Sequence, residues 1–308
     1  MAVAAESRPV GRVTRSGVRR SRKFGYLLLA PALIYILLLV AVPFGLAIWY
    51  SISNVTVNNL SGKFVGLDNY VSLIHDPTFR QALYNTFVYT VATTIIVGIL
   101  GTLLAFILLA NFPGKRVIRF LILLPWTIPI ALTIESWKWM YFPQYSVLNW
   151  IGIHLHILSG PYGIVWLGSP STALPAAIAV NVWRNFAFGA IILLAGLTSI
   201  PPDIIDAARI DGAGFWRRFH YIMVPMMLPI LFIGLLFTVV FTFTDLTIIF
   251  LLTNGGPANA SQVLANYAFL VGISSGNLSQ GAAITLFLLP VLLIVSVLFL
   301  RQLRRRDV

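Results

Sequence analysis

Long apolar runs without charge constrain this chain more than any other feature. The first such run covers residues 24–50 and contains no Asp, Glu, Lys or Arg. A helix needs about 20 mostly apolar residues to cross the hydrocarbon core of a bilayer. By that measure we expect six spans, at residues 24–50, 82–110, 117–141, 173–199, 226–252 and 282–300. The sequence therefore predicts an all-α integral membrane protein with six transmembrane helices.

The scarcity of charged residues excludes a water-soluble globule. Only 10% of the 308 residues are charged, whereas a soluble domain carries about 25%. The first run is also too long for a secretory signal peptide, whose apolar core has about 7–15 residues. We therefore expect it to remain as a span. It would follow a basic tail at residues 1–23 and begin a transmembrane domain at residues 24–300.

Basic residues indicate the side of the membrane on which each loop lies. The formal net charge is +12, which could indicate a surface for nucleic acid. However, 17 of the 21 Lys and Arg residues fall in short segments beside the apolar runs, at residues 8–23, 115–119, 209–218 and 301–306. Cytoplasmic loops of membrane proteins carry such an excess. The pattern predicts cytoplasmic amino and carboxyl termini, with a basic tail at residues 301–308, and no nucleic-acid partner.

Several kinds of chemistry are excluded by residues that the chain lacks. It has no cysteine, which excludes disulfides, thiolate catalysis and cysteine-ligated zinc. Two Gly-Lys pairs, at 62–63 and 114–115, lack the following Ser or Thr of a Walker loop. His154 and His156 have no carboxylate nearby, so we expect them to be ordinary loop residues. We expect no enzymatic activity and no metal or cofactor bound by this chain.

The cytoplasmic loop at residues 200–225 contains signals for two short helices and a turn. Prolines at 201–202 suit the first turn of a helix, where a missing N–H is not needed. Asp203 then lies near the positive amino-terminal end of that helix. Gly212 and Gly214 suit the following turn, and we expect Pro225 to limit the second helix. An ordinary amphipathic connector is the alternative interpretation.

This loop also carries a spaced motif, with members at Asp206, Ala207, Ala208, Gly212, Ile222, Val224 and Pro225. The spacing resembles the signature of permease subunits from binding-protein-dependent ABC importers. That signature is Glu-Ala-Ala, three residues, Gly, nine residues, Ile, one residue, Leu-Pro. Asp and Val replace Glu and Leu here. Segments at 66–70, 195–197, 211–213 and 253–257 resemble the carbohydrate-uptake branch, in the subunit type typically encoded first of the pair.

The resemblance implies a type I ABC importer permease fold and a mechanism of coupling. The first short helix of the loop would be the coupling helix, which inserts into a cleft on a cytoplasmic ATPase subunit. Closure of two ATPases around ATP would then swing the permease from inward-open to outward-open. The residues implied for this coupling loop are Asp206, Ala207, Ala208, Asp211, Gly212, Ala213, Ile222 and Pro225.

The resemblance also implies partners, a location and a class of substrate. The partners are a second permease subunit in a heterodimer, two cytoplasmic ABC ATPases that bind the ATP, an extracytoplasmic solute-binding protein and membrane lipid. The location is the cell membrane of a prokaryote. The substrate would be a sugar or sugar-like solute, with disaccharides, oligosaccharides and glycerol-phosphate-like solutes all left open.

Two other classes of function are weighed against this one. An ion-gradient-driven secondary transporter would explain the spans, but it would not explain the loop motif and would work without an ATPase. A membrane-embedded enzyme would need a nucleophile and base, or a metal cluster, that the spans do not offer.

Charged residues inside the predicted spans are candidates for the translocation pathway, because charge at membrane depth is costly. Glu135 and Lys138 lie three residues apart near the outer end of the third span, where snorkelling explains them. Arg184 and Asp245 lie deeper, at roughly 16 and 10 Å from the outer ends of their spans. They could pair in the pathway, or form a purely structural ion pair. Because sugars are held by hydrogen bonds and aromatic faces, the candidate pathway residues are Asn181, Trp183, Arg184, Asn185, Phe243, Thr244 and Asp245.

Overall fold

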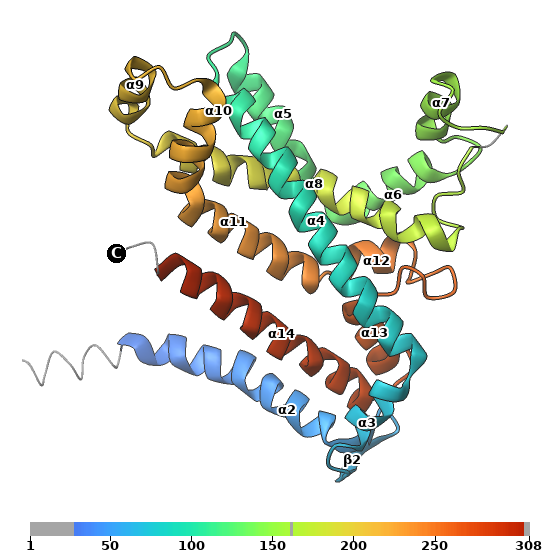
Figure 1. Ribbon diagram of the computed structural model, residues 1–308. Helices are drawn as coiled ribbons and strands as arrows, with labels where there is room; N and C mark the ends of the chain where they lie inside the picture. Colours follow the sequence, from blue (N-terminus) through green and yellow to red (C-terminus); the bar gives the residue numbers. More distant parts are fainter. Residues whose placement is uncertain (1–27, 161–162, 305–308) are drawn as a thin grey trace, which may run out of the picture. The chain divides into compact units, whose positions relative to one another are not determined.

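The computed structural model describes residues 28–160 and 163–304 and is mostly helical (Figure 1). Five helices are long and apolar enough to cross a membrane: Leu28–Ser51, Pro77–Leu109, Pro170–Thr198, Phe215–Phe243 and Leu278–Gln302. A bent pair, Lys115–Thr127 and Ile130–Tyr141, makes a sixth crossing if it counts as one span. Each of the six predicted apolar runs overlaps one of these helices or the bent pair. The predicted basic tail at 1–23 lies outside the described residues.

Two compact units make up the chain, with the boundary after residue 49. The described part of the first unit is helical and contains a π-helical turn, η1 (Leu37–Ala41), followed by α2 (Val42–Ser51). The N–H of Val42 bonds to the carbonyl oxygen of the residue five positions back. That wider turn stands just before Pro43, which has no N–H to give to a regular α-helical ladder. The helix therefore continues through a proline.

The second unit is built around α4 (Pro77–Leu109), α8 (Pro170–Thr198) and α11 (Val224–Phe243), which pack against one another. The helices α4 and α8 approach closely where Gly101 faces Gly189. A methyl group on Gly101 would lie 3.3 Å from the carbonyl carbon of Gly189. Small residues let membrane helices pack in this way. The crossing fixes the polar residues of α4 and α8 relative to one another.

The third predicted span is not one continuous helix. Its two parts, α5 (Lys115–Thr127) and α6 (Ile130–Tyr141), meet at an angle of 94°. Ile128 and Pro129 at the break have extended backbone, with ψ of 138° and 127°. A proline disfavours helical backbone at the residue before it and cannot donate to the ladder. The expectation of an unbroken helix here is therefore wrong.

The fifth predicted span is also broken. The helix α11 ends at Phe243, Asp245 lies in the break, and the short α12 (Thr247–Leu252) follows. The Oδ1 atom of Asp245 accepts hydrogen bonds from the N–H groups of Thr247 at 2.9 Å and Ile248 at 3.3 Å. Short acidic side chains compete with the helical ladder and start helices in this way. The expectation of one helix through Asp245 is wrong for that reason.

The helix after the glycine turn runs directly into the fifth span. The segments α10 (Phe215–Arg218), η2 (Phe219–Met223) and α11 form one helix of 29 residues. As in η1, the N–H just before the proline reaches five residues back, here from Val224 to Phe219. Pro225 therefore lies inside a continuous helix, and the expectation that it limits the second short helix is wrong.

Short elements connect the spans. They are the antiparallel strands β1 (Ser53–Thr56) and β2 (Asn59–Phe64), then α3 (Asp68–His75), α7 (Val147–His154), α13 (Leu264–Phe269) and η3 (Leu270–Ser274), before the last helix α14 (Leu278–Arg304). The small hairpin is an exception to the all-α prediction. Its pairing runs over a few residues only, so the architecture remains helical.

Buried polar side chains of α4 anchor the loop between α12 and α13. Asn85 Nδ2 donates to the carbonyl oxygens of Ala260 at 3.0 Å and Gln262 at 2.9 Å. Thr86 Oγ1 accepts from the N–H of Leu264 at 2.9 Å. Buried backbone groups of a loop need such partners. The loop is thereby tied to α4.

Candidate functional site

The loop after α8 forms the helix and glycine turn that its sequence predicts. The helix α9 covers Pro202–Ile210, and Gly212 follows with φ of +73°. The N–H of Gly212 bonds to the carbonyl oxygen of Arg209 at 3.0 Å, and that of Ala213 to Ala208 at 2.9 Å. These are the two bonds of a Schellman motif. A Cβ on Gly212 would meet nothing within 4 Å, so backbone conformation rather than space favours glycine.

One face of α9 packs against the rest of its unit. Ala208 is only 8% exposed. Ile205 packs against a buried cluster that includes Leu197 and Met223. Gly214 has an ordinary φ of −66° and precedes α10, so Gly212 alone supplies the left-handed turn. The loop is thus seated on its own chain through an apolar contact.

Aromatic side chains fix the following helix to the end of α4. The ring of Phe106 lies edge-on to Phe215 and Phe219, with centroid distances of 5.8 and 5.4 Å. The guanidinium of Arg218 donates from Nη1 to the carbonyl oxygen of Ala213 at 2.6 Å. Figure 1 shows α9 at the edge of the unit, beyond α10 and the end of α4. The turn is held from both sides, while α9 remains at the periphery.

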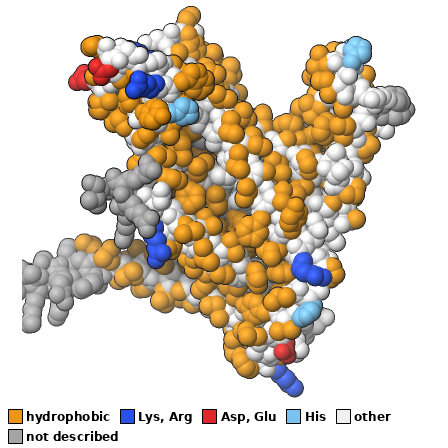
Figure 2. Space-filling view, in the orientation of Figure 1, with side chains coloured by type: hydrophobic (Ala, Val, Ile, Leu, Met, Phe, Trp, Pro, Cys, Tyr) orange, Lys and Arg blue, Asp and Glu red, His pale blue; other side chains and the backbone are white. Residues whose placement is uncertain are grey.

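The remaining surface of α9 and its turn is open. The predicted coupling residues that are exposed are Asp206, Ala207, Asp211, Gly212 and Pro225, whereas Ala213 and Ile222 are half-buried. Ile210, which sequence reasoning did not select, is 87% exposed. The signal that could have found it is a large aliphatic residue directly before the helix-ending turn. In Figure 2 charged side chains at this end border a mainly apolar surface.

A polar cavity of about 310 Å³ lies beside α8. The α5–α6 bend and the α11–α12 break both contribute to its wall. The lining residues are Trp126, Ile130, Asn181, Arg184, Asn185, Phe241, Asp245, Thr247 and Ile248. Among the residues that the structure describes, no group of three or more His, Cys, Asp or Glu could hold a metal ion. The cavity offers amides, charge and aromatic faces.

A chain of hydrogen bonds links this cavity to α4. Tyr89 donates its hydroxyl to Asp245 Oδ2 at 2.9 Å and accepts from Asn181 Nδ2 at 2.6 Å. Asn185 Nδ2 donates to the carbonyl oxygen of Asn181 at 3.0 Å and also to its side-chain oxygen. Tyr89 is fully buried. Sequence reasoning missed it, because a lone tyrosine in an apolar span is ordinarily a packing residue.

Arg184 and Asp245 line the same cavity without forming an ion pair. Among the described side chains, the ion pairs within 4 Å are Lys138 with Glu135 at 2.8 Å and Arg209 with Asp206 at 2.9 Å. Glu135 and Lys138 are three residues apart, and this spacing predicted that they would be neighbours on one helix face. The direct pair that the depths of Arg184 and Asp245 suggested does not form.

The other three candidate pathway residues lie outside this cavity. Trp183 does not line it and packs edge-on to Trp137, with ring centroids 5.6 Å apart. Phe243 is buried and packs edge-on to Phe87, with ring centroids 5.7 Å apart. Thr244 is exposed, and its Oγ1 donates to the carbonyl oxygen of Val240 at 2.9 Å. The structure therefore brings together Asn181, Arg184, Asn185 and Asp245.

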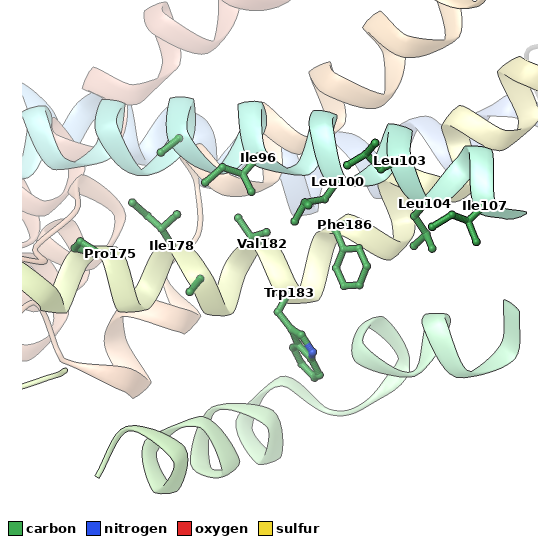
Figure 3. A pocket seen from close by; sticks show the side chains of 12 residues that line it. Ile96, Leu100, Leu103, Leu104, Ile107, Pro175, Ile178, Val182, Trp183 and Phe186 are labelled. Atoms are coloured by element: carbon green, nitrogen blue, oxygen red, sulfur yellow. The ribbon is translucent and has the colours of Figure 1, made fainter. Parts of the chain in front are cut away.

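A larger cavity of about 710 Å³ lies between α4 and α8 and is apolar (Figure 3). Side chains such as Ile96 and Leu100 line it from α4, and Ile178, Val182 and Trp183 line it from α8. The indole nitrogen of Trp183 is the one polar side-chain atom of this lining. A solute rich in hydroxyl groups would lose its hydrogen bonds to water there without replacement. This cavity suits an apolar occupant.

A polar contact at the other end of α4 ties it to α13. Asp76 Oδ1 accepts from the N–H of Thr78 at 2.8 Å and caps α4, and Asp76 Oδ2 accepts from the hydroxyl of Tyr267. Burial raises the pKa of Tyr267 above its usual range, and the neighbouring Asp76 carboxylate raises it further. The phenol therefore stays protonated as a donor well into alkaline conditions.

Comparisons with known proteins connect these features to transport. Residues 97–307 match the family described as binding-protein-dependent transport system inner membrane component. The trehalose/maltose transport system permease protein MalF of Thermococcus litoralis is 32% identical over 289 residues, which cover 94% of this chain and 96% of that protein. The sulfoquinovosyl glycerol transport system permease protein SmoG of Agrobacterium fabrum is 30% identical over 308 residues, with coverage of 99% and 98%.

A solved structure shares the fold. It is a chain of a bacterial ABC transporter involved in the import of the acidic polysaccharide alginate. The TM-score is 0.79 at 21% sequence identity, over 94% of this chain and 98% of that one. The agreement extends over nearly the whole length of both chains.

Proposed function

Because the chain belongs to the family of binding-protein-dependent transport system inner membrane components, we propose that it forms half of the translocation pathway of an ATP-driven importer. It is a multi-pass protein of a prokaryotic membrane. The proposed solute is a sugar or sugar-like molecule. Relatives that match almost the full length are named for trehalose, maltose and sulfoquinovosyl glycerol transport, which supports that class.

The exposed α9 with its fixed turn is the observation that carries this proposal. A coupling element must be held firmly by its own chain and must still present a free surface to its partner. Ala208 provides the seat and Gly212 the fixed turn, while Ile210 and Ala207 remain exposed. We assign α9 as the docking helix for a cytoplasmic ATPase subunit, with Ile210 as its apolar anchor.

The polar cavity is our assignment for the solute. Its volume of about 310 Å³ lies at the lower end of small-molecule sites, which measure about 300–1,000 Å³. Asn181 and Asn185 carry amides that suit hydroxyl groups, and Trp126 and Phe241 offer aromatic faces. The neighbouring apolar cavity has aromatic faces, from Trp183 and Phe186, but no amide. We therefore assign a sugar-sized solute to the polar cavity rather than to the apolar one.

Six membrane crossings are too few to enclose a complete translocation pathway, so further subunits are needed. We propose a second permease subunit as the other half of a heterodimer, and an extracytoplasmic solute-binding protein that delivers the solute. Two partner ATPases bind and hydrolyse the ATP. The basic segments support a cytoplasmic position for α9 and for both termini.

Copurification and reconstituted uptake test this function together. An affinity-tagged chain is extracted from its native membrane in mild detergent. We expect an ATPase and a second permease to accompany it, and uptake by proteoliposomes to require ATP and the solute-binding protein. A chain that purifies alone and drives uptake from an ion gradient would establish the secondary transporter instead.

A further inference from the structure

We propose that the polar cavity takes a solute that carries an oxyanion, such as a carboxylate, phosphate or sulfonate on a sugar-like body, and that Arg184 receives this group. Arg184 can meet a solute only if the cavity belongs to the translocation pathway, so this inference rests on the proposed function. It narrows the class of solute from any sugar to an acidic one.

The guanidinium of Arg184 is free to bind. It lines the cavity and is half-buried. Among the side chains that the structure describes, none forms an ion pair with it within 4 Å, and no protein oxygen accepts a hydrogen bond from it. An arginine carries a permanent charge and five N–H donors in a planar fork. That fork matches two oxygens of one oxyanion better than it matches separate hydroxyl groups.

Asp245 accepts no hydrogen bond from Arg184, although the two charges interact electrostatically, and other donors engage both of its oxygens. Tyr89 donates to Oδ2 at 2.9 Å, and the N–H groups of Thr247 and Ile248 donate to Oδ1 at 2.9 and 3.3 Å. A carboxylate has about four acceptor positions, and three are filled. Asp245 thus holds the α11–α12 break in place, while Arg184 presents its charge to the cavity.

A single introduced thiol can measure the electrostatic potential at this place, because the chain has no cysteine. Asn185 lines the same cavity as Arg184, so Asn185→Cys is made in the complete transporter. The thiol is reacted with a methanethiosulfonate bearing a sulfonate and with one bearing a trimethylammonium group, and labelling is followed by the mass of this subunit. Ser159→Cys, in an exposed part of the uncharged 142–172 loop, supplies the control ratio.

The anionic reagent is expected to react roughly tenfold faster than the cationic one at position 185, relative to the control, because unit charges a few ångströms apart interact strongly outside bulk water. Adding Arg184→Gln should abolish this preference, and Arg184→Lys should keep it. Equal rates, or a preference that Arg184→Gln leaves unchanged, would overturn the inference and leave the importer function untouched.

Matched solutes test the occupant itself. Glucose 6-phosphate and glucose, at equal concentration, are added before labelling of Asn185→Cys with an uncharged methanethiosulfonate. The phosphate ester should slow labelling severalfold and glucose should not; equal protection, or none, counts against the inference. If no reagent reaches position 185 while Ser159→Cys reacts normally, the inference and the assignment of the cavity to the solute both fail. Copurification decides the importer function separately.

Discussion

The α9 loop and the polar cavity handle charge in opposite ways. On α9, Asp206 and Arg209 form an ion pair at 2.9 Å with both side chains 60% exposed. In the cavity, Arg184 and Asp245 are half-buried and stay unpaired with each other. An exposed ion pair contributes about 0–1 kcal/mol, whereas a charge at membrane depth is costly and points to function. The comparison indicates that α9 binds its partner through its exposed apolar surface, whereas the cavity binds its solute through charge and hydrogen bonds.

The largest expected effect comes from a substitution on the exposed surface of α9. Ile210→Asp places a charge where the apolar anchor meets the ATPase. Loss of an interface anchor costs about 2 kcal/mol or more, so ATP-driven uptake should fall at least tenfold. Uptake of a candidate sugar by proteoliposomes of the complete transporter measures this.

A matched variant at a different exposed aliphatic residue provides the control. Leu60 in β2 is 66% exposed, and Leu60→Asp should leave uptake within about twofold, because a surface substitution away from an interface is usually tolerated. Equal losses of uptake in both variants would mean that exposed apolar side chains matter for insertion or solubility. The assignment of α9 as the docking helix would then be contradicted.

An intermediate effect is expected from the hydroxyl group that links the cavity to α4. Tyr89→Phe leaves Asp245 Oδ2 and Asn181 Nδ2 without this partner, at a cost of about 1–3 kcal/mol. Uptake should fall roughly tenfold. Tyr141→Phe is the matched control, because Tyr141 is also buried and donates to the carbonyl oxygen of Ala176 at 2.9 Å.

Thermal unfolding and uptake are compared for these two tyrosine variants. Tyr89→Phe loses two buried hydrogen bonds and Tyr141→Phe loses one, so both should lose stability, Tyr89→Phe somewhat more. Only Tyr89→Phe should lose uptake. If uptake falls equally in both variants, the hydrogen bonds of Tyr89 contribute only to stability, as those of any buried tyrosine do, and the cavity has no separate role in uptake.

The smallest effect is expected for a contact that belongs to neither region. Tyr267→Phe removes the donor to Asp76, and uptake at neutral pH should stay unchanged while the melting temperature drops slightly. Because the folded pKa of Tyr267 is raised, its contribution is fully present below about pH 10, the unfolded value. It is lost as the pH rises from there through the folded pKa.

Melting temperatures of the unmodified chain and Tyr267→Phe, measured from pH 7 to 11, follow this contribution. The difference between the two should be constant up to about pH 10 and should then shrink. A difference that grows or stays constant above pH 10 would contradict the raised pKa.

The two regions also differ in how far their sequence predicts them. The start, turn and end of α9 depend on Pro202, Asp203 and Gly212, which act within about three helical turns. Local signals of this kind can be read directly. The burial of Ala208, which the resemblance implied as a coupling residue, and the exposure of Ile210 do not follow from such signals, because both depend on what surrounds the loop.

The polar cavity depends on breaks in the helices of two apolar runs, and the sequence pattern does not show where these breaks occur. Pro43 and Pro225 lie in continuous helices, each just after a π-helical turn. Pro129, in contrast, lies at a 94° bend. A proline alone therefore does not show where a span breaks. The bond from Tyr89 to Asp245 joins residues 156 positions apart, and no local pattern encodes such a pairing.

Docking of α9 on an ATPase can be tested most directly by photo-cross-linking. Ala207→Cys provides the single thiol of this chain, at an exposed position of α9, and carries a benzophenone maleimide in the assembled transporter. We predict that light joins this chain to the ATPase subunit, and that Ser159→Cys treated in the same way does not capture it. An ATPase cross-link from Ser159→Cys, or none from Ala207→Cys in a complex that contains the ATPase, would contradict the account.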